Sequence, residues 1–400
     1  MQFLRLALSR ATTAFKQSCG TVVRLDAVPA DLVDRATTPG IPDSRYWLGA
    51  HIGPFIEGAL NDHRREVAFL AAQGLPTDPL PPIHVLAISG GGDRGAFGAG
   101  LLSGWTAHGS RPRFKVVTGI SAGALIAPFA YLGPAHDPTL REFAVSAGLD
   151  GVFRTRALLA GLSSDGMADS APLARLVEKY VTPGLLSAIA AEYATGRALV
   201  VGTTELDSGR AVSWNMGAIA GSGTPEALEL FRRVMVASAS IPGVVTPVMI
   251  DVEVEGRRYQ EMHVDGGVIN QVFTYPSNTL AALERALGRP YRREMHIYAV
   301  RNGKLLPEWA ATPRRTLSIG GRAFGLLMQR QGLGDLEQIY RTALQDGADF
   351  NLACIGADFT QGKARDFDPE YMQHLFDYAH RRGAQGCDWQ KTLPGGLPPR

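Results

Sequence analysis

The sequence predicts an α/β fold in which helices cover both faces of a mostly parallel central sheet. Two short apolar runs, residues 83–89 and 114–118, each end at glycines, as buried parallel strands commonly do. A helical stretch follows each run, at 97–107 and from about 121 to 131. This alternation of strand, glycine loop and helix is typical of parallel strands joined by crossover helices.

The later part of the chain continues the same alternation. Glu255-Gly256 separates two alternating runs, which predicts a hairpin with a glycine turn. Leu336, Ile339, Tyr340 and Leu344 recur at helical spacing and predict one more helix. The other predicted elements are strands at 198–204, 248–254, 258–264 and 296–300 and a helix at 229–238.

Composition and charge exclude several classes of protein. A chain of 400 residues, 45% of them hydrophobic, can bury a large core. Forty basic residues nearly balance 38 acidic ones, so no nucleic acid is expected as a partner held by bulk charge. Cys19, Cys354 and Cys387 fit neither a disulfide framework nor the ligand spacing of a zinc site, so no metal is expected.

The N-terminal residues 1–25 are interpreted as a mobile or helical arm. Arg5, Arg10 and Lys16 interrupt the apolar stretch that a secretory signal needs. Cys19-Gly20 is similar to the start of a mature bacterial lipoprotein, and a degraded lipoprotein signal is the alternative interpretation. No apolar run reaches the roughly 18 residues of a spanning helix. We therefore expect a cytoplasmic or peripherally membrane-associated protein.

The sharpest local motif is Gly119-Ile120-Ser121-Ala122-Gly123, which lies between a predicted strand and a predicted helix. In such a turn the small residues leave room for the chain to reverse and present the serine hydroxyl. The helix N-terminus below the serine favours developing negative charge. The motif predicts a nucleophile at Ser121, and an ordinary tight turn is the alternative.

A second motif, Gly90-Gly91-Gly92-Asp93-Arg94-Gly95, follows the strand at 83–89. Its spacing also fits a dinucleotide-binding loop, but that site needs an acidic residue about 20 positions later. No Asp or Glu occurs from Arg94 to His136, which argues against a nucleotide. Consecutive glycines instead favour an oxyanion hole, because their N–H groups can converge on one oxygen. A purely structural glycine turn is the third interpretation.

A third motif, Asp265-Gly266-Gly267, closes the predicted hairpin. Taken alone, an aspartate at a strand end followed by two glycines indicates an Asx turn. His263 lies two positions earlier and would share a sheet face with Asp265. We interpret this histidine as a surface or packing residue.

In this order, the three motifs resemble the patatin-like phospholipase family, which includes lipid acyl hydrolases of the patatin and cytosolic phospholipase A2 type. The segments at 169–173, 203–209 and 237–243 are also similar to the family. The resemblance implies a patatin-like three-layer α/β fold. It divides the chain into an N-terminal extension, partly irregular, at 1–80, a catalytic domain at 81–390 and a loose tail at 391–400.

The resemblance also implies a role for each motif residue. Ser121 would be the nucleophile and Asp265 its base, in a Ser-Asp dyad that needs no cofactor or metal. A free aspartate has a pKa near 3.9, so the pocket must raise the pKa of Asp265 for it to act as a base. The remaining implied site residues are the oxyanion hole at Gly90, Gly91, Gly92, Arg94 and Gly95, the nucleophile elbow at Gly119, Ala122 and Gly123, and the Asp-Gly-Gly glycines Gly266 and Gly267.

Two alternatives to the dyad enzyme remain open at this point. Ser121, Asp265 and His296 occur in the chain order of a Ser-His-Asp α/β-hydrolase, although His296 falls within a predicted strand. The same fold could also serve a catalytically silent lipid-binding or scaffold protein. Both interpretations that depend on the family resemblance, the dyad enzyme and the silent protein, imply a lipid as the partner, most simply a phospholipid. They also imply transient contact with a membrane surface.

The segment Thr312–Gly334 is the sequence candidate for that contact. It carries Arg314, Arg315, Arg322 and Arg330 and no acidic residue, with leucine, isoleucine, phenylalanine and methionine interspersed. This composition is typical of a basic amphipathic surface helix. A solvated basic face over an ordinary core helix is the alternative.

Overall fold

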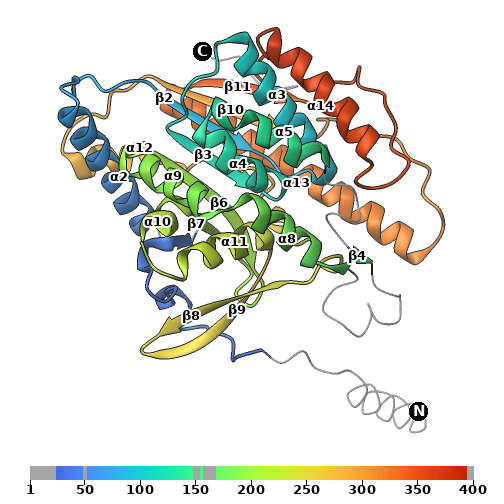
Figure 1. The fold of residues 1–400 in the computed structure, drawn as a ribbon, viewed down its shortest axis with the longest axis horizontal. Helices are drawn as coiled ribbons and strands as arrows, with labels where there is room; N and C mark the ends of the chain where they lie inside the picture. Colours follow the sequence, from blue (N-terminus) through green and yellow to red (C-terminus); the bar gives the residue numbers. More distant parts are fainter. Residues whose placement is uncertain (1–23, 48–51, 147–153, 156–167, 394–400) are drawn as a thin grey trace.

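The computed structural model describes residues 24–47, 52–146, 154–155 and 168–393. Within them, a nine-stranded mixed sheet forms the centre of the molecule (Figure 1). Its strands are ordered β1-β7-β6-β3-β2-β10-β11, and the hairpin of β8 and β9 joins through β9 and β6. Cys19 and the N-terminal arm discussed above lie outside the described residues.

Five neighbouring strands of this sheet are parallel, as the sequence predicts. They are β6 (Ala198–Glu205), β3 (Val116–Ile120), β2 (Ile83–Ile88), β10 (Met295–Arg301) and β11 (Asp349–Cys354). The antiparallel β7 (Arg210–Asn215) and the short β1 (Arg45–Trp47) extend one edge. The predicted hairpin is present as β8 (Val248–Val254) and β9 (Arg257–Asp265), and β9 pairs antiparallel with β6.

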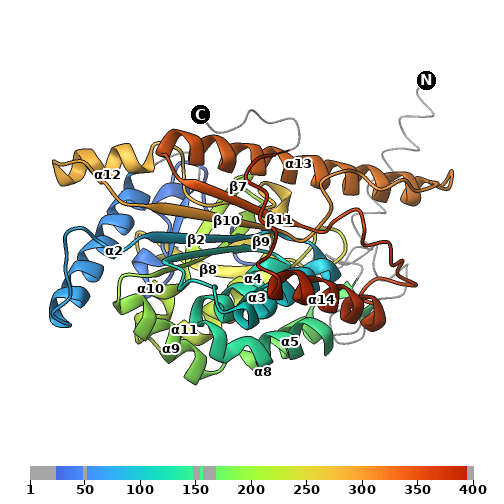
Figure 2. The same ribbon diagram turned by 90° about the horizontal axis from the view of Figure 1, so that it is seen from above.

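Helices cover both faces of the sheet, which confirms the predicted three-layer α/β arrangement (Figure 2). One face carries α12 (Thr279–Leu287) and α13 (Thr316–Asp346). The opposite layer contains α3 (Gly95–His108), α4 (Ala122–Leu132), α5 (Asp137–Ser146), α8 (Ala171–Tyr180), α9 (Pro183–Ala194), α10 (Met216–Gly221), α11 (Ala227–Ser238) and α14 (Pro369–Ala384). A two-stranded ribbon of β4 (Arg154–Thr155) and β5 (Ala168–Asp169) stands apart from the main sheet.

The alternation of side chains along β2 shows why both faces need helices. Leu86 and Ile88 are buried in the core on the α3 and α4 side. Val85 and Ala87 are buried in a second core that the C-terminal half of α13 closes. Because successive side chains of a strand point to opposite faces, a fully apolar strand requires cover on both sides.

Residues before position 80 contribute to the same architecture. The strand β1 pairs with β7 at the edge of the central sheet, and α2 (Ile52–Ala72) packs against α9 and α12. The edge strand β1 is only three residues long, so it leaves little periodic signal in the sequence.

Candidate active site

Ser121 occupies a strained turn between β3 and α4. Its backbone has φ of +53° and ψ of −122°, a conformation that residues with a side chain rarely adopt. A Cβ atom on Gly119 would lie 2.5 Å from the carbonyl oxygen of Gly123, and one on Gly123 would lie 2.2 Å from that of Ile88. The turn therefore closes only with glycine on both sides of Ser121, which is the geometry expected of a nucleophile elbow.

Ser238, the last residue of α11, holds this turn in place. The backbone N–H of Ser121 donates to Ser238 Oγ over 3.0 Å, and Ser238 Oγ donates to the carbonyl of Gly202 over 2.7 Å. Sequence reasoning found the segment 237–243 only as part of a family resemblance and gave Ser238 no role. No local pattern could have done so, because Ser238 and Ser121 are 117 positions apart.

The glycine loop at 90–95 lies directly beside this turn. A Cβ on Gly90 would lie 3.3 Å from Ser121 Cβ, and one on Gly95 would lie 2.9 Å from Ala122 Cβ. The two loops therefore lie side by side at the carboxyl ends of β2 and β3. Gly91 also needs to be glycine, since its Cβ would lie 2.5 Å from the carbonyl oxygen of Asn302.

The four glycines of the loop differ in what their N–H groups can do. The Gly95 N–H already donates to the carbonyls of Gly92 and Asp93. The Gly90 N–H donates to the carbonyl of Gln271 over 2.9 Å, so it supports the loop and is not a free donor. This differs from the prediction that places Gly90 in the oxyanion hole. The N–H groups of Gly91 and Gly92 have no acceptor among the described residues. Only these two remain available to an oxygen beside Ser121.

A contact from the far end of the chain fixes the loop. The buried carboxylate of Asp93 accepts from Lys363 Nζ over 2.8 Å and from the backbone N–H of Phe367 over 3.1 Å. The two partners are 270 and 274 positions away in the chain, so no local pattern indicates them. This contact ties the first turn after the glycines to the segment before α14.

Asp265 is the last residue of β9 and lies opposite Thr203 of β6. Its carboxylate accepts the Gly267 N–H over 2.7 Å, which is the Asx turn that the sequence indicates. It also accepts a hydrogen bond from the Ser121 hydroxyl. Asp265 is 2% exposed. Burial raises its pKa to about 6, although both hydrogen bonds favour the ionised form.

Close contacts also explain the two glycines after Asp265. A Cβ on Gly266 would lie 2.6 Å from the carbonyl oxygen of Gly202, so the chain passes tightly over β6. Gln271 then links the two loops, because its carbonyl accepts from Gly90 and its Nε2 donates to the Gly267 carbonyl over 3.0 Å. Sequence reasoning gave Gln271 no role.

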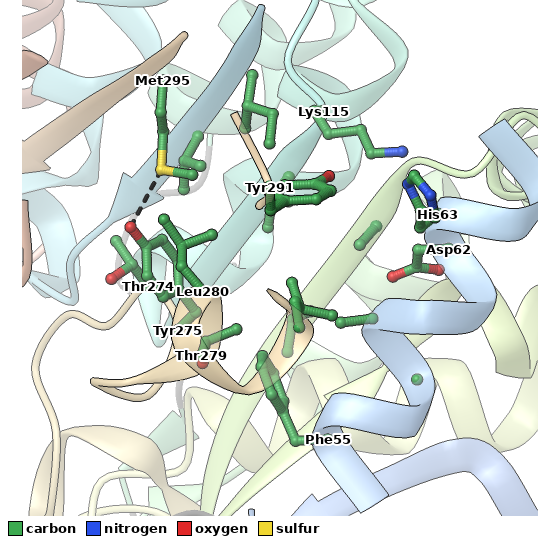
Figure 3. A pocket seen from close by; sticks show the side chains of 18 of the residues that line it. Phe55, Asp62, His63, Lys115, Thr274, Tyr275, Thr279, Leu280, Tyr291 and Met295 are labelled. Atoms are coloured by element: carbon green, nitrogen blue, oxygen red, sulfur yellow. Dashed lines mark hydrogen bonds between the residues drawn. The ribbon is translucent and has the colours of Figure 1, made fainter. Parts of the chain in front are cut away.

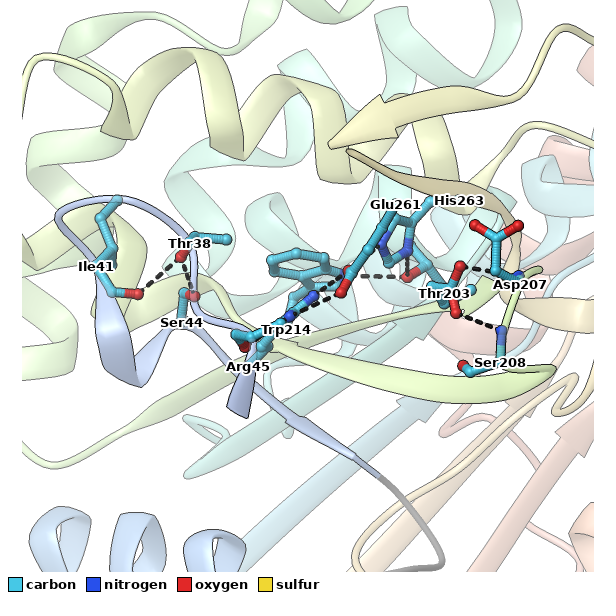
Figure 4. Close-up of polar contacts among 12 residues, drawn as sticks. Thr38, Ile41, Ser44, Arg45, Thr203, Asp207, Ser208, Trp214, Glu261 and His263 are labelled. Carbon is cyan, nitrogen blue, oxygen red and sulfur yellow. Dashed lines mark hydrogen bonds and ion pairs between the residues drawn. The ribbon is translucent and has the colours of Figure 1, made fainter. Parts of the chain in front are cut away.

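A buried polar network holds β9 in register upstream of Asp265 (Figure 4). Arg45 of β1 forms an ion pair with Glu261, and both side chains are 3% exposed. His263 Nε2 donates to Glu261 over 3.0 Å, which leaves Nδ1 to accept from the Thr203 hydroxyl over 2.9 Å. Trp214 Nε1 also donates to that hydroxyl over 2.8 Å. His263 is thus fully buried, and its ring is a positioning element of the sheet.

The charge of Glu261 is stabilised within this network. Burial alone would raise its pKa, but Arg45 and His263 outweigh that effect and lower it to about 2. A buried carboxylate with such partners stays ionised at any ordinary pH. The network therefore joins β9, the strand that ends at Asp265, to β1 through the buried ion pair of Glu261 and Arg45.

His296, the third member of the alternative triad, lies far from Ser121. It pairs with His84 near the beginning of the parallel strands, whereas Ser121 follows their carboxyl ends. His296 lies four positions before Val300, which aligns with Ile88 and through it with Gly119. At about 3.3 Å per residue, the separation along the strands exceeds about 13 Å. The described structure brings Ser121 and Asp265 together and leaves His296 apart.

Two positively charged side chains, Arg94 and Arg301, lie at the same sheet edge as the glycine loop. Arg301 ends β10 and is 6% exposed, and its Nε and Nη1 atoms have no partner among the described residues. Burial and the nearby charge of Arg94 lower the pKa of Arg301 to about 10. Two close guanidinium groups without a bound carboxylate favour an anionic group of a ligand.

A separate apolar pocket lies at the other end of the sheet (Figure 3). Its wall includes Ile83 and Val116, which begin β2 and β3, together with residues of α2 and α12. Asp62, His63 and Lys115 form its polar side (Figure 3). Because Ser121 follows the opposite ends of these strands, this pocket is not the site of the three motifs.

Neither a membrane-spanning helix nor a metal-binding cluster occurs among the described residues. No helix among them is both long and apolar enough to cross a bilayer. No group of three or more His, Cys, Asp or Glu side chains in those ranges is arranged to hold a metal ion.

Comparison with known protein families gives a match to part of the chain. The model of the patatin-like phospholipase family matches residues 86–276, which include all three motifs. One similar solved structure is VipD from Legionella pneumophila, at 10% identity and a TM-score of 0.38, covering 76% of this chain and 66% of that one. Another is full-length SpcU in complex with full-length ExoU from the type III secretion system of Pseudomonas aeruginosa, at 14% identity and a TM-score of 0.32. That alignment covers 77% of this chain and 52% of the other.

This chain therefore spans about two thirds or less of the length of these neighbours. No curated protein sequence matches it significantly. The family match confirms the resemblance drawn from the motifs, and residues 86–276 form a domain of the patatin-like phospholipase family.

Proposed function

We propose that this protein is a serine-dependent lipid acyl hydrolase in which Ser121 and Asp265 form a catalytic dyad. The observation that carries the proposal is the hydrogen bond from the strained Ser121 to a buried carboxylate whose pKa is about 6. A base with a pKa near the working pH can accept a serine proton, which a solvated aspartate does poorly. The family match supports lipid hydrolysis in general.

In the proposed reaction, Ser121 Oγ attacks the carbonyl carbon of a lipid ester while its proton passes to Asp265. The carbonyl oxygen becomes an oxyanion and accepts the N–H groups of Gly91 and Gly92. Collapse of this intermediate breaks the ester bond, and the departing alcohol takes the proton from Asp265. Water then attacks the acyl-enzyme and gives a proton to Asp265. Collapse of the second intermediate breaks the bond between the acyl group and Ser121 Oγ, which takes the proton back from Asp265, and the fatty acid is released.

We further propose that the preferred lipid is a phospholipid. Arg94 and Arg301 place two positive charges beside the glycine loop, and part of Arg301 is buried without a partner among the described residues. A phosphodiester in this position would relieve the repulsion between the two guanidinium groups. A neutral acylglycerol would not.

Replacing Arg301 with glutamine tests this preference. Loss of a charged hydrogen-bond partner of the phosphate should lower kcat/KM for phosphatidylglycerol about tenfold or more. The loss for diacylglycerol should be much smaller, so the ratio of the two rates is the informative measurement. Equal losses on both substrates would mean that Arg301 only supports the fold.

Fluorophosphonate labelling tests the proposed function most directly. The reagent phosphorylates activated serines, so the folded wild-type protein should give one adduct, and peptide mass spectrometry should place it on Ser121. Labelling should increase as the pH rises through about 6, because Asp265 must be ionised to accept the proton. A folded protein that remains unlabelled with and without phospholipid vesicles would favour the catalytically silent lipid-binding alternative.

The His296→Ala variant separates the dyad from the triad. His296 contacts Asp349 over 3.2 Å and Glu294 over 2.9 Å at the far end of the sheet. We therefore expect kcat on a soluble ester to stay within about twofold of wild type. A loss above about a hundredfold in a protein with an unchanged circular dichroism spectrum would contradict the dyad.

A further inference from the structure

The first half of α13 is mostly exposed, with few contacts to the rest of the described protein. Every buried residue of this 31-residue helix lies at Gly332 or later. The part before Gly332 extends past the edge of the sheet, and both views of the ribbon show it at the margin of the molecule (Figures 1 and 2). Most helices of a globular protein bury one face along their whole length.

Large apolar side chains are exposed on this half-helix and on the loop before it. Trp309 is 89% exposed, Leu317 is 75% exposed and Leu327 is 69% exposed. Leu306, Ile319 and Phe324 are exposed as well. We call residues 306–331 the α13 surface. Several large exposed apolar side chains on one segment mark a site of contact with a partner or a membrane.

The α13 surface carries a net positive charge. Arg314, Arg315, Arg322 and Arg330 form no ion pair within the described residues. The surface contains a single acidic residue, Glu308, and Lys304 neutralises it over 2.7 Å. Arginines interspersed with exposed leucine and aromatic residues suit a layer whose surface is anionic and whose interior is apolar.

The α13 surface leads directly to the proposed active site. Met328, on the turn of α13 that follows the exposed leucines, contacts Gln271 Nε2 at 3.5 Å. A Cβ on Gly267 would lie 3.0 Å from Met328 Cε, which places this methionine against the Asp-Gly-Gly turn. Gly267 in turn donates its N–H to Asp265. A lipid held on the α13 surface therefore lies next to the residues proposed to hydrolyse it.

A buried carboxylate about two turns further along the helix anchors this arrangement. The buried Asp335 accepts the backbone N–H of Gln271 over 2.6 Å and that of Val272 over 3.3 Å. The C-terminal half of α13 is thus fixed to the loop that follows the Asp-Gly-Gly motif. The exposed half projects from a rigid attachment and is held in a set position relative to Ser121.

From these observations we propose that the α13 surface docks onto an anionic phospholipid bilayer and delivers lipid to Ser121. The inference rests on the proposed function, because it assigns the surface through which that site receives its substrate. Two other occupants fit the charge less well. A second copy of this surface would bring its arginines against the same arginines, and residues 1–23 contain basic but no acidic residues.

Vesicle binding by two double variants and one single-residue control variant tests the proposal. The probes are phosphatidylglycerol vesicles and phosphatidylcholine vesicles, with binding measured by sedimentation. Leu317→Asp with Ile319→Asp removes two apolar contacts near the helix N-terminus, where acidic residues do not harm the helix. Arg314→Gln with Arg315→Gln removes charge alone. The matched control is Leu75→Asp, an exposed leucine near the beginning of β2 at the other end of the sheet.

We expect wild type and the control to bind phosphatidylglycerol vesicles more tightly than phosphatidylcholine vesicles, and less tightly as salt rises. Each surface arginine contributes about fivefold to binding on an anionic membrane, so the variant that lacks two arginines should bind about 25-fold more weakly. The leucine–isoleucine variant should lose about tenfold or more on both vesicles. Neither variant should change hydrolysis of a soluble short-chain ester, which does not need the surface.

The soluble ester keeps the two proposals apart. Normal vesicle binding without any ester hydrolysis would overturn the proposed function and leave the docking surface standing. Ester hydrolysis with vesicle binding that the two variants do not weaken would overturn the docking surface alone. A lipid-free dimer that the leucine–isoleucine variant dissociates, or vesicle binding that appears only after removal of residues 1–23, would also overturn it.

Discussion

Replacing Ser121 with alanine is expected to lower the rate of ester hydrolysis by about 10⁴-fold or more. The two other serines next to this turn are fully buried, and their hydroxyls already donate to backbone carbonyls, Ser89 to Gly90 and Ser238 to Gly202. Neither is therefore expected to take over the attack. Loss of a nucleophile in enzymes with an oxyanion hole has effects of this size. The measurement is kcat on a soluble ester and on phospholipid vesicles, with the fluorophosphonate adduct as a second readout.

The same change should leave the fold intact. Alanine and serine both carry a Cβ, so the substitution neither relieves nor adds strain at φ of +53°. The exposed Ser187 of α9 offers a matched control, and Ser187→Ala should keep full activity. A Ser121→Ala protein that retains more than a few per cent of the rate, with a normal melting temperature, would exclude Ser121 as the nucleophile.

A further consequence of Ser121→Ala concerns the neighbouring carboxyl. The hydroxyl of Ser121 favours the ionised form of Asp265 and so opposes the effect of burial. Its removal should raise the pKa of Asp265 above about 6. Titration of this carboxyl in the two proteins by NMR would measure the contact independently of any substrate.

The local parts of the site are readable in the sequence because each is a short-range packing requirement. Gly119 and Gly123 are needed where the chain turns back on itself at Ser121, and the motif contains both. The Asx turn at Asp265 is present as well. Here a structural and a catalytic interpretation are compatible, since the Gly267 N–H holds the same carboxylate that contacts Ser121.

The supports of the site are not readable, because they depend on contacts between distant segments. Ser238 accepts a hydrogen bond from the Ser121 N–H although the two residues are 117 positions apart. Lys363 donates to Asp93, which is 270 positions away in the chain. A serine at a helix end and a lysine in a loop look like ordinary polar residues in the sequence. The same reason explains Gly90, whose N–H is taken by Gln271, a contact that no spacing rule predicts.

The Asp265→Asn variant should combine loss of activity with a gain in stability. Asparagine cannot accept the serine proton, so kcat should fall by about 10³-fold or more. In the wild type, burial raises the pKa of Asp265 to about 6 from an ordinary value of 3.8. The folded protein therefore binds this proton more tightly than the unfolded chain does. Stability is lost as the pH rises from about 4 to about 6 and is then constant.

A shift of this size corresponds to about 3 kcal/mol of unfavourable free energy for the ionised carboxylate at neutral pH. Asparagine carries no charge, and its side-chain oxygen can still accept the Gly267 N–H. The variant should thus melt a few degrees above wild type at pH 7 and show no advantage below about pH 4. Its activity should lack the rise through about pH 6 that wild type shows.

The pH dependence is what distinguishes a catalytic base from a structural aspartate. The control is Asp251→Asn, an exposed aspartate on the neighbouring β8, which should change neither rate nor melting temperature. If Asp265 instead stabilised the fold through its charge, Asp265→Asn would melt below wild type at pH 7 and the deficit would shrink toward acid pH. The expected result for Asp265→Asn is a lower rate together with a gain in stability that is confined to higher pH. This result would mean that the buried charge of Asp265 destabilises the fold and is kept because the reaction needs it.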